Sequence, residues 1–133
     1  MILIREAYPE EKETIAKMLG DTELPIDNDV DIVVESEGVL LGYGGFDFDR
    51  KDVLLKSVYI TPDHRGQRLG DGLVRAIINY ADRRNINKIY ISDNNADEYF
   101  KRFGFKNISN NKNNKCFFEL DVKEFFNNLK CQD

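Results

Sequence analysis

The sequence lacks the features of a membrane or secreted protein. Among its 133 residues there is no apolar run long enough to cross a bilayer, and no apolar segment follows a basic start. Its two cysteines, Cys116 and Cys131, do not have the spacing of a metal site. A disulfide between them is one alternative, but two free thiols are expected in a reducing cytosol. We therefore expect a soluble cytoplasmic protein without a metal site or a membrane partner.

Basic residues are also fewer than acidic ones. The chain has 19 Lys and Arg against 24 Asp and Glu, which gives a formal net charge of -5 at pH 7. Neutralising the phosphates of a nucleic acid requires a basic face, so we expect no nucleic-acid partner, and any polyanionic ligand must meet a local basic site. The single histidine, His64, lies in a loop before Arg65 and is expected to be solvated rather than to act as a base.

What is present suffices for one hydrophobic core. Hydrophobic residues make up 41% of the chain, and a chain of this length is expected to form a single domain over residues 1–133. Apolar periodicity and turn residues predict a strand, a helix, three strands, a helix, a strand, a helix, two strands and a short terminal helix. In chain order these are strand 2–5, a helix from Pro9 to the residue before Gly20, strands 32–35, 39–48 and 53–60, a helix from Leu69 to about Arg83, strand 88–92, helix 96–103, strands 105–108 and 116–122, and helix 123–129.

This order predicts a mixed α/β sheet covered by helices. The strand at 53–60 is apolar apart from Lys56 and Ser57, which is typical of a central strand with two covered faces. A helix separates it from the strand at 88–92, so we expect these two strands to be parallel.

Residues 58–73 combine the end of a strand, a glycine-rich basic turn and the start of an amphipathic helix. Pro62 ends the strand ladder because it brings no N–H group. Gly66, Gly70 and Gly72 let a ligand approach the main chain without meeting a Cβ atom. The first turn of the following helix has N–H groups without an internal partner and a partial positive charge. The sequence therefore predicts an anion-binding turn here.

The run from Gln67 to Gly72, with Pro62 and the pair Arg65 and Gly66 before it, resembles the acyl-CoA-binding signature of the GNAT N-acetyltransferase superfamily. In that signature Gln or Arg, two residues, Gly, one residue, and Gly or Ala open the central helix. Residues 96–105, ADEYFKRFGF, are similar to the family's later motif: an alanine, a helix with two adjacent aromatics, and a closing Gly-Phe. The resemblance implies a GNAT-like domain that uses acetyl-CoA as a co-substrate.

The resemblance places most of the cofactor contacts on the main chain. The N–H groups from Gln67 to Gly72 would hold the CoA pyrophosphate, with Arg65 and Arg68 adding charge near the phosphates. The backbone of Val58 and Ile60 would bond the pantetheine arm, and the N–H of Val58 would polarise the thioester carbonyl as an oxyanion donor. The expected cofactor set is Val58, Ile60, Arg65, Gly66, Gln67, Arg68, Leu69, Gly70, Asp71, Gly72, Asn94 and Phe100.

The later motif departs from the family pattern. Its second aromatic is usually a tyrosine that protonates the leaving thiolate, but that position holds Phe100, and Tyr99 lies one residue earlier, about 100° around the helix. Tyr99 is still a candidate acid. Loss of a positioned acid predicts a rate lower by about 10² to 10⁴. Subgroups resembling amino-acid and arsinothricin acetyltransferases carry two phenylalanine-like aromatics here. Asp93 stands where asparagine is common, and Asn94 is the candidate replacement for its pantetheine contact.

The acceptor is less constrained. The strand at 53–60 has no glutamate to act as a base, and Lys56 either faces the acceptor cleft, where it would favour a carboxylate, or extends to the edge of the sheet. Because no cysteine or serine stands in a nucleophile setting, we expect direct attack by the acceptor in a ternary complex.

The expected function is acetyl transfer to the primary amine of a small molecule, such as an amino acid, by a monomer or homodimer. A CoA-binding regulatory module whose chemistry has decayed is the alternative. A protein or peptide acetyltransferase is less favoured, because the short polar segment at residues 21–29 offers little surface for a long substrate.

Overall fold

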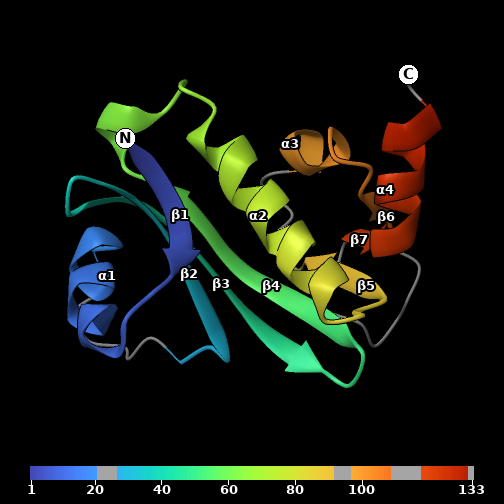
Figure 1. Ribbon diagram of the computed structural model, residues 1–133, viewed down its shortest axis with the longest axis horizontal. Helices are drawn as coiled ribbons and strands as arrows, with labels where there is room; N and C mark the ends of the chain where they lie inside the picture. The colour runs from blue at the N-terminus through green and yellow to red at the C-terminus, as the bar shows by residue number, and fades with distance from the viewer. Residues whose placement is uncertain (21–26, 92–96, 109–117, 132–133) are drawn as a thin grey trace. The chain divides into compact units, whose positions relative to one another are not determined.

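The predicted order of elements is confirmed by a computed structural model, which describes residues 1–20, 27–91, 97–108 and 118–131 (Figure 1). The elements are β1 (Ile2–Glu6), η1 (Pro9–Glu11), α1 (Lys12–Met18), β2 (Val30–Ser36), β3 (Val39–Asp49), β4 (Asp52–Ile60), η2 (Pro62–His64), α2 (Leu69–Arg83), β5 (Lys88–Ile91), α3 (Asp97–Lys101), β6 (Lys106–Asn107), β7 (Phe118–Asp121) and α4 (Val122–Cys131).

The strands form a mixed sheet in the order β1-β2-β3-β4-β5-β7-β6. β4 and β5 are parallel, with Asp52 opposite Lys88 and Leu55 opposite Ile91. The pairs β1 with β2, β2 with β3, β5 with β7 and β6 with β7 are antiparallel. The predicted mixed sheet, the central position of β4 and its parallel neighbour are therefore all confirmed.

Two compact units make up the chain. One contains Met1–Asp47 and Ser57–Ile77, and the other contains Phe48–Lys56 and Ile78–Asp133. Strands β3 and β4 and helix α2 contribute residues to both units. The single domain over residues 1–133 stays a prediction.

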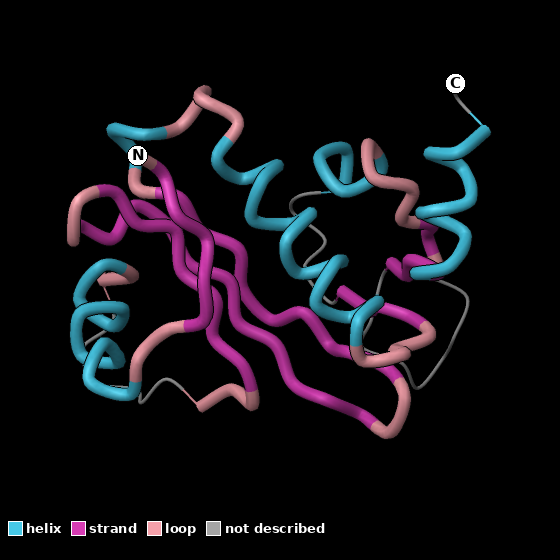
Figure 2. The backbone as a smooth tube through the Cα atoms, in the orientation of Figure 1, coloured by secondary structure: helices cyan, strands magenta, loops and turns pink. Residues whose placement is uncertain are grey.

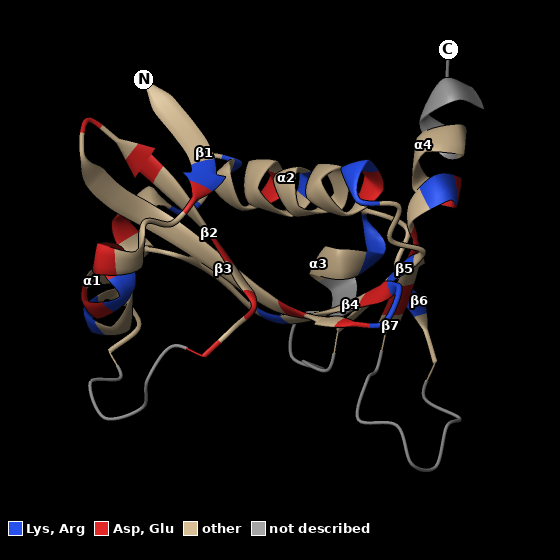
Figure 3. Ribbon diagram, turned by 60° about the horizontal axis from the view of Figure 1, so that its bottom comes forward, with Lys and Arg blue, Asp and Glu red and all other residues tan. Residues whose placement is uncertain are grey.

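In the first unit, side-chain alternation assigns the two faces of strands β1 to β3 to different helices. Tyr43 and Val33 pack with Ile15 of α1 on one face, and all three are at most 1% exposed. The next residue along β3, Gly44, points the other way, where a Cβ atom would lie 2.8 Å from Cδ1 of Ile77 in α2. Figure 3 shows α1 and the first half of α2 on opposite faces of these strands.

The second unit has its own buried core. It is made of aliphatic residues from β4, β5, β7 and the second half of α2, together with aromatic residues near α3. Its members include Val53, Leu55, Ile78, Ala81, Ile89, Ile91, Phe100, Phe103, Phe105, Phe118 and Leu120. No helix within the described ranges has both the length and the hydropathy needed to cross a bilayer.

Several element ends differ from the predictions for local reasons. The first helix opens with a 3-10 turn at Pro9–Glu11 because the proline fixes φ and leaves out an N–H. The third helix ends at Lys101, and Gly104, at φ 102°, turns the chain towards β6. That strand has two residues instead of the predicted four (Figure 2). Residues 21–26, within the short polar segment at 21–29, and residues 109–117 lie outside the described residues.

Candidate active site

The predicted anion-binding turn joins β4 to α2 within the first unit. It leaves the sheet at Thr61, whose N–H donates to the carbonyl of Leu41 in β3 at 2.9 Å. The next residues form the 3-10 turn Pro62–His64, in which the N–H of His64 donates to the carbonyl of Thr61 at 2.9 Å. The His64 Nδ1 atom also lies 2.9 Å from Oγ1 of Thr61. The start of the turn is thus fixed to the sheet by short-range bonds.

Arg65 folds back onto the strand that precedes it. Its Nε donates to the carbonyl of Ile60 at 2.8 Å, and its guanidinium carbon lies 5.3 Å from the centre of the Tyr59 ring. The structure therefore brings together two predicted cofactor residues, Arg65 and Ile60, in direct contact. Their roles toward CoA stay predictions.

The backbone of the turn reverses direction at two positions with positive φ. Gly66 has φ 83°, and Arg68 has φ 64°. Helix α2 then begins at Leu69, and the N–H of Gly72 bonds back to the carbonyl of Arg68 at 3.2 Å. The N–H groups of Leu69 and Gly70 precede that bond, so the helix itself gives them no acceptor. The turn thus presents main-chain donors at the positive end of a 15-residue helix.

Two glycines of the turn, Gly66 and Gly72, are required for different reasons. A Cβ atom at Gly66 would meet nothing within 4 Å, so its glycine is required by the positive φ and not by crowding. At Gly72 a Cβ atom would lie 3.2 Å from Cδ1 of Ile4, which shows how closely the first turn of α2 packs on β1. A phosphate-bearing ligand suits such a turn because main-chain N–H groups at the N-terminus of a helix bind anions.

Strand β4 leads to the turn. Its described ladder with β5 covers Asp52 to Leu55, and the strand itself continues to Ile60. Val58 and Ile60 are half-buried on that continuation, and Lys56 is exposed. Lys56 belongs to the second unit, whereas Val58, Ile60 and the turn belong to the first.

The sequence model of the acetyltransferase (GNAT) family matches residues 2–105, which include this turn and both sequence motifs. The chain belongs to the GNAT acetyltransferase family. A putative ribosomal protein bS18-alanine N-acetyltransferase of Bacillus subtilis (strain 168) is 28% identical over 79 residues, or 56% of this chain and 52% of that protein. The match thus spans about half the length of that curated relative.

Solved GNAT structures share the fold. A GNAT-family acetyltransferase of Staphylococcus aureus Mu50 has a TM-score of 0.74 at 18% identity, covering 92% of this chain and 99% of that one. The ribosomal-protein-S18-alanine N-acetyltransferase of Escherichia coli has a TM-score of 0.73 at 13% identity, covering 92% and 94%. The PaiA N-acetyltransferase of Thermoplasma acidophilum, solved with coenzyme A, has a TM-score of 0.72 at 13% identity, covering 91% and 99%.

The later GNAT motif lies in the second unit, on α3 and the turn after it. Phe100 is 4% exposed, and its ring packs against Phe105 at 5.5 Å and Tyr99 at 5.2 Å between centroids. Phe100 and Phe103 are both buried in the core of this unit. The Tyr99 hydroxyl oxygen is also buried. Asn94, the predicted pantetheine contact, lies outside the described residues.

A polar cluster that the sequence did not reveal holds the start of β2 against β3 in the first unit. The Tyr43 hydroxyl donates to Oδ1 of Asp31 at 2.8 Å, and Nδ2 of Asn28 donates to the same oxygen at 2.9 Å and contacts the hydroxyl. Burial and the Asp31 hydrogen bond raise the pKa of Tyr43 far above its ordinary value. Tyr43 is therefore a neutral donor, and the strand alternation gave no signal that these three residues meet.

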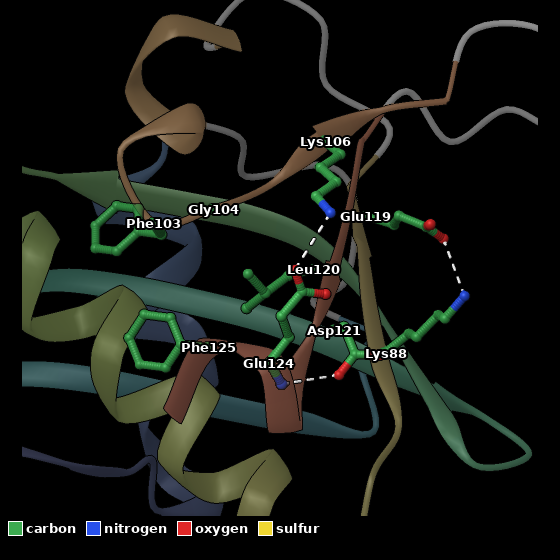
Figure 4. A pocket seen from close by; sticks show the side chains of 9 residues that line it. All are labelled: Lys88, Phe103, Gly104, Lys106, Glu119, Leu120, Asp121, Glu124 and Phe125. Carbon is green, nitrogen blue, oxygen red and sulfur yellow. Dashed lines mark hydrogen bonds and ion pairs between the residues drawn. The ribbon is translucent and has the colours of Figure 1, made fainter. Parts of the chain in front are cut away.

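The second unit also contains a surface hollow, shown in Figure 4. Its charged walls are paired: Nζ of Lys106 lies 3.3 Å from Oε1 of Glu124, and Nζ of Lys88 lies 3.6 Å from Oε2 of Glu119. The N–H of Glu124 donates to Oδ1 of Asp121 at 3.0 Å, which caps α4. None of the predicted site residues lines this hollow.

Proposed function

We propose that this chain transfers an acetyl group from acetyl-CoA to a primary amine. The observation that carries the proposal is the turn from Gly66 to Gly72, which presents main-chain N–H groups at the N-terminus of α2, directly after β4. Membership of the GNAT family supports it. So do two solved relatives, the Thermoplasma PaiA enzyme bound to coenzyme A and a Brucella melitensis acetyltransferase bound to acetyl-CoA.

In this proposal the chain binds and orients the thioester, and the acceptor amine is the nucleophile that attacks it. Main-chain N–H groups from Gln67 to Gly72 hold the pyrophosphate, and the backbone of Val58 and Ile60 lines the pantetheine arm. The amine nitrogen attacks the acetyl carbonyl, whose oxygen becomes an oxyanion as the C–N bond forms. The C–S bond then breaks, the sulfur leaves as a thiolate, and the proton that the nitrogen loses passes to solvent, from which the thiolate is protonated. The N–H of Val58 stabilises the oxyanion that develops.

The CoA thiolate can leave without a general acid to protonate it. Phe100 has no proton to give, and a thiol has a reference pKa of roughly 8.5, so the thiolate is a tolerable leaving group near neutral pH. The reaction is therefore expected to run without the family's tyrosine, at a rate lower than that of an enzyme with a positioned acid.

The relatives change which acceptor is favoured. The sequence favoured a small-molecule amine, whereas the Bacillus subtilis relative and the Escherichia coli structure are both named for N-acetylation of an alanine of ribosomal protein S18. We therefore propose the α-amine of a protein N-terminus as the first acceptor to test. A free amino acid is the second, because Lys56 places an exposed cation on β4.

The test follows free thiol when the protein is incubated with acetyl-CoA and each of two acceptor panels. One panel holds peptides that begin with alanine and copy the N-termini of ribosomal proteins, with N-terminally blocked peptides as the control; the other holds pooled amino acids and amines. We expect turnover with free N-termini and acetylated product by mass spectrometry. Tight CoA binding without turnover on either panel would instead support a CoA-binding module, and absence of CoA binding would contradict the proposal altogether.

A further inference from the structure

We propose that the open edge of β1 pairs with β1 of a second copy of this chain. The two strands are antiparallel and are related by a twofold axis at Leu3, so that the sheet continues from one copy into the other. β1 stands at one end of the strand order, and β2 is the strand that it pairs with among the described residues. The proposal does not depend on acetyl transfer.

One hydrogen bond shows which main-chain groups of β1 face away from β2. The N–H of Ala7 donates to the carbonyl of Asp31 at 2.8 Å, and the register of the two strands, continued by one residue, places these two residues opposite each other. In an antiparallel ladder, residues that bond directly to the facing strand alternate with residues whose groups point outward. The odd-numbered residues of β1 therefore bond to β2, whereas the main-chain groups of Ile2, Ile4 and Glu6 point to the open edge.

The outward groups at the start of β1 are available for a further strand. Within the described part of the chain, no hydrogen bond involves the outward N–H and C=O groups of Ile2 and Ile4. The carbonyl of Glu6 differs, because it accepts a hydrogen bond from Nη1 of Arg5 at 3.0 Å. The open stretch therefore runs from Ile2 to Ile4, and it offers both donors and acceptors.

The side chains of this stretch favour pairing. Ile2 is 45% and Leu3 48% exposed, and alternation places them on opposite faces of the strand. The stretch has no proline, no lysine and no register shift against β2, which are features that protect a sheet edge. At the other end of the strand order, β6 has two residues and begins with Lys106, so that edge is short and charged.

The order of residues on β1 matches the same strand reversed. An axis at Leu3 sets Ile2 opposite Ile4 of the second copy and Leu3 opposite itself, so every outward donor of the stretch meets an acceptor and every side-chain contact is apolar. An axis at Ile4 would use the carbonyl of Glu6, which Arg5 already occupies. An axis at Arg5 would place two guanidinium groups face to face, and like charges directly opposite are destabilising. A second copy joined at Leu3 is therefore the occupant that this edge fits.

The contact is small, so the dimer is expected to dissociate on dilution. Few residues of each copy take part, and interfaces of this size are typical of transient complexes. We expect a Kd on the order of 10 to 100 μM, measured by sedimentation velocity of the full chain with any tag at its C-terminus. A chain that remains monomeric up to about 1 mM, well above this Kd, would overturn the proposal.

Charge substitutions at the axis provide the sharpest test. In Leu3→Lys and in Leu3→Glu, each substituted residue faces its own copy, so the Kd of each variant alone should rise at least about tenfold. An equimolar mixture of the two variants brings opposite charges together and should associate more tightly than either variant alone. Failure of the mixture to associate more tightly, or wild-type association by Leu3→Glu alone, would overturn the axis at Leu3.

Two further variants separate pairing through the edge from general stickiness. Val39→Lys is the matched control: Val39 is 60% exposed, more than Leu3, but it lies on β3, two strands from the edge, so the Kd should not change. Ile2→Pro removes an outward N–H and leaves the ladder with β2 intact, so it should raise the Kd at least about tenfold with little change in Tm. An Ile2→Pro protein that still associates as wild type would contradict main-chain pairing.

Hydrogen exchange reads the register directly. At protein concentrations above the Kd, the amides of Ile2 and Ile4 should exchange more slowly than at concentrations below it. The amide of Leu3, which bonds to β2, should be protected at both concentrations, and that of Glu6 should not respond. Concentration-dependent protection of Glu6 would show an axis at Ile4 and overturn the proposed register, and protection that ignores concentration throughout β1 would overturn pairing between copies.

Discussion

Arg5 shows at the residue scale how a single side chain organises the edge of the first unit. Its Nε donates to Oε1 of Glu35 at 2.7 Å, its two terminal nitrogens donate to the carboxylate of Glu11 at 2.9 and 3.0 Å, and its guanidinium lies 4.1 Å from the Tyr8 ring. The Arg5 hydrogen bonds are the largest cause that lowers the pKa of both Glu11 and Glu35. These residues join β1, η1 and β2.

Glu11→Gln is expected to lower the free energy of unfolding by up to about 1 kcal/mol at pH 7, because the pair with Arg5 is partly exposed. A carboxylate whose pKa is lowered by folding stabilises the protein above its unfolded pKa, near 4.5, and loses that effect as the pH falls through the folded pKa. Urea unfolding at pH 7 and below pH 4 should therefore show a difference from wild type that disappears in acid.

The control for that experiment is Glu13→Gln. Glu13 lies 3.6 Å from Lys17, with its side chain 82% exposed, so its substitution should leave stability unchanged at every pH. Equal losses in the two variants would show that the Glu11 cluster contributes nothing specific.

Lys56→Ala tests acceptor choice. If Lys56 faces the acceptor, its removal should raise the KM for carboxylate-bearing amines about threefold and leave kcat nearly unchanged, because an exposed ion pair contributes to ground-state and transition-state binding alike. An alanine-initiated peptide without a nearby carboxylate provides the matched substrate, whose KM should not change. Unchanged Michaelis constants for both substrates would remove Lys56 from the site.

Among the elements, β3 needs two adjacent glycines because neighbouring side chains leave no room for a Cβ atom on either face of the strand. Gly44 makes room for α2, with Cδ1 of Ile77 2.8 Å from the position of an added Cβ and Cδ1 of Leu73 3.4 Å from it. Gly45 faces the polar cluster, where an added Cβ would lie 2.9 Å from Cζ of Tyr43 and closer still to its hydroxyl and to Asn28. The ring of Tyr43 is 1% exposed and hydrogen-bonded, so it cannot move aside.

Gly45→Ala is therefore expected to destabilise the fold by about 1 to 3 kcal/mol, because an inserted methyl group displaces a rigid, bonded ring. Gly44→Ala should cost less, since Cδ1 of Ile77 is the flexible end of its side chain. Urea unfolding of the pair gives the comparison. A Gly45→Ala protein at least as stable as Gly44→Ala would show that the cluster around Tyr43 is easily rearranged.

At the scale of the whole molecule, cofactor binding should be visible as stability. At a CoA concentration one hundred times its Kd, the native state gains about 2.7 kcal/mol, and Tm rises accordingly. Hydrogen exchange should show the gain concentrated in the amides of residues 66–72, where main-chain donors would meet phosphate. Protection spread evenly along the chain, or confined to the second unit, would contradict binding at this turn.

Local patterns predicted much of the fold, including the turn between β4 and α2. Pro62, the glycines of the turn and the spacing of Leu73, Ile77 and Ala81 placed a strand end, a glycine-rich turn and an amphipathic helix in the right order. Helical spacing of aromatic residues is typical of a core, and Phe100 on α3 is 4% exposed.

Neighbours a few residues apart were enough to predict the order of elements and the turn that opens α2. The parallel direction of β4 and β5 followed from the helix between them. The tertiary structure decided contacts between distant residues, such as Asn28 with Tyr43, 15 residues apart, and Arg5 with Glu35, 30 residues apart. It also distinguished Arg65, bonded to Ile60, from Arg68, at φ 64° without a described side-chain bond. These outcomes depend on the path of the folded backbone, which no periodicity or local propensity specifies.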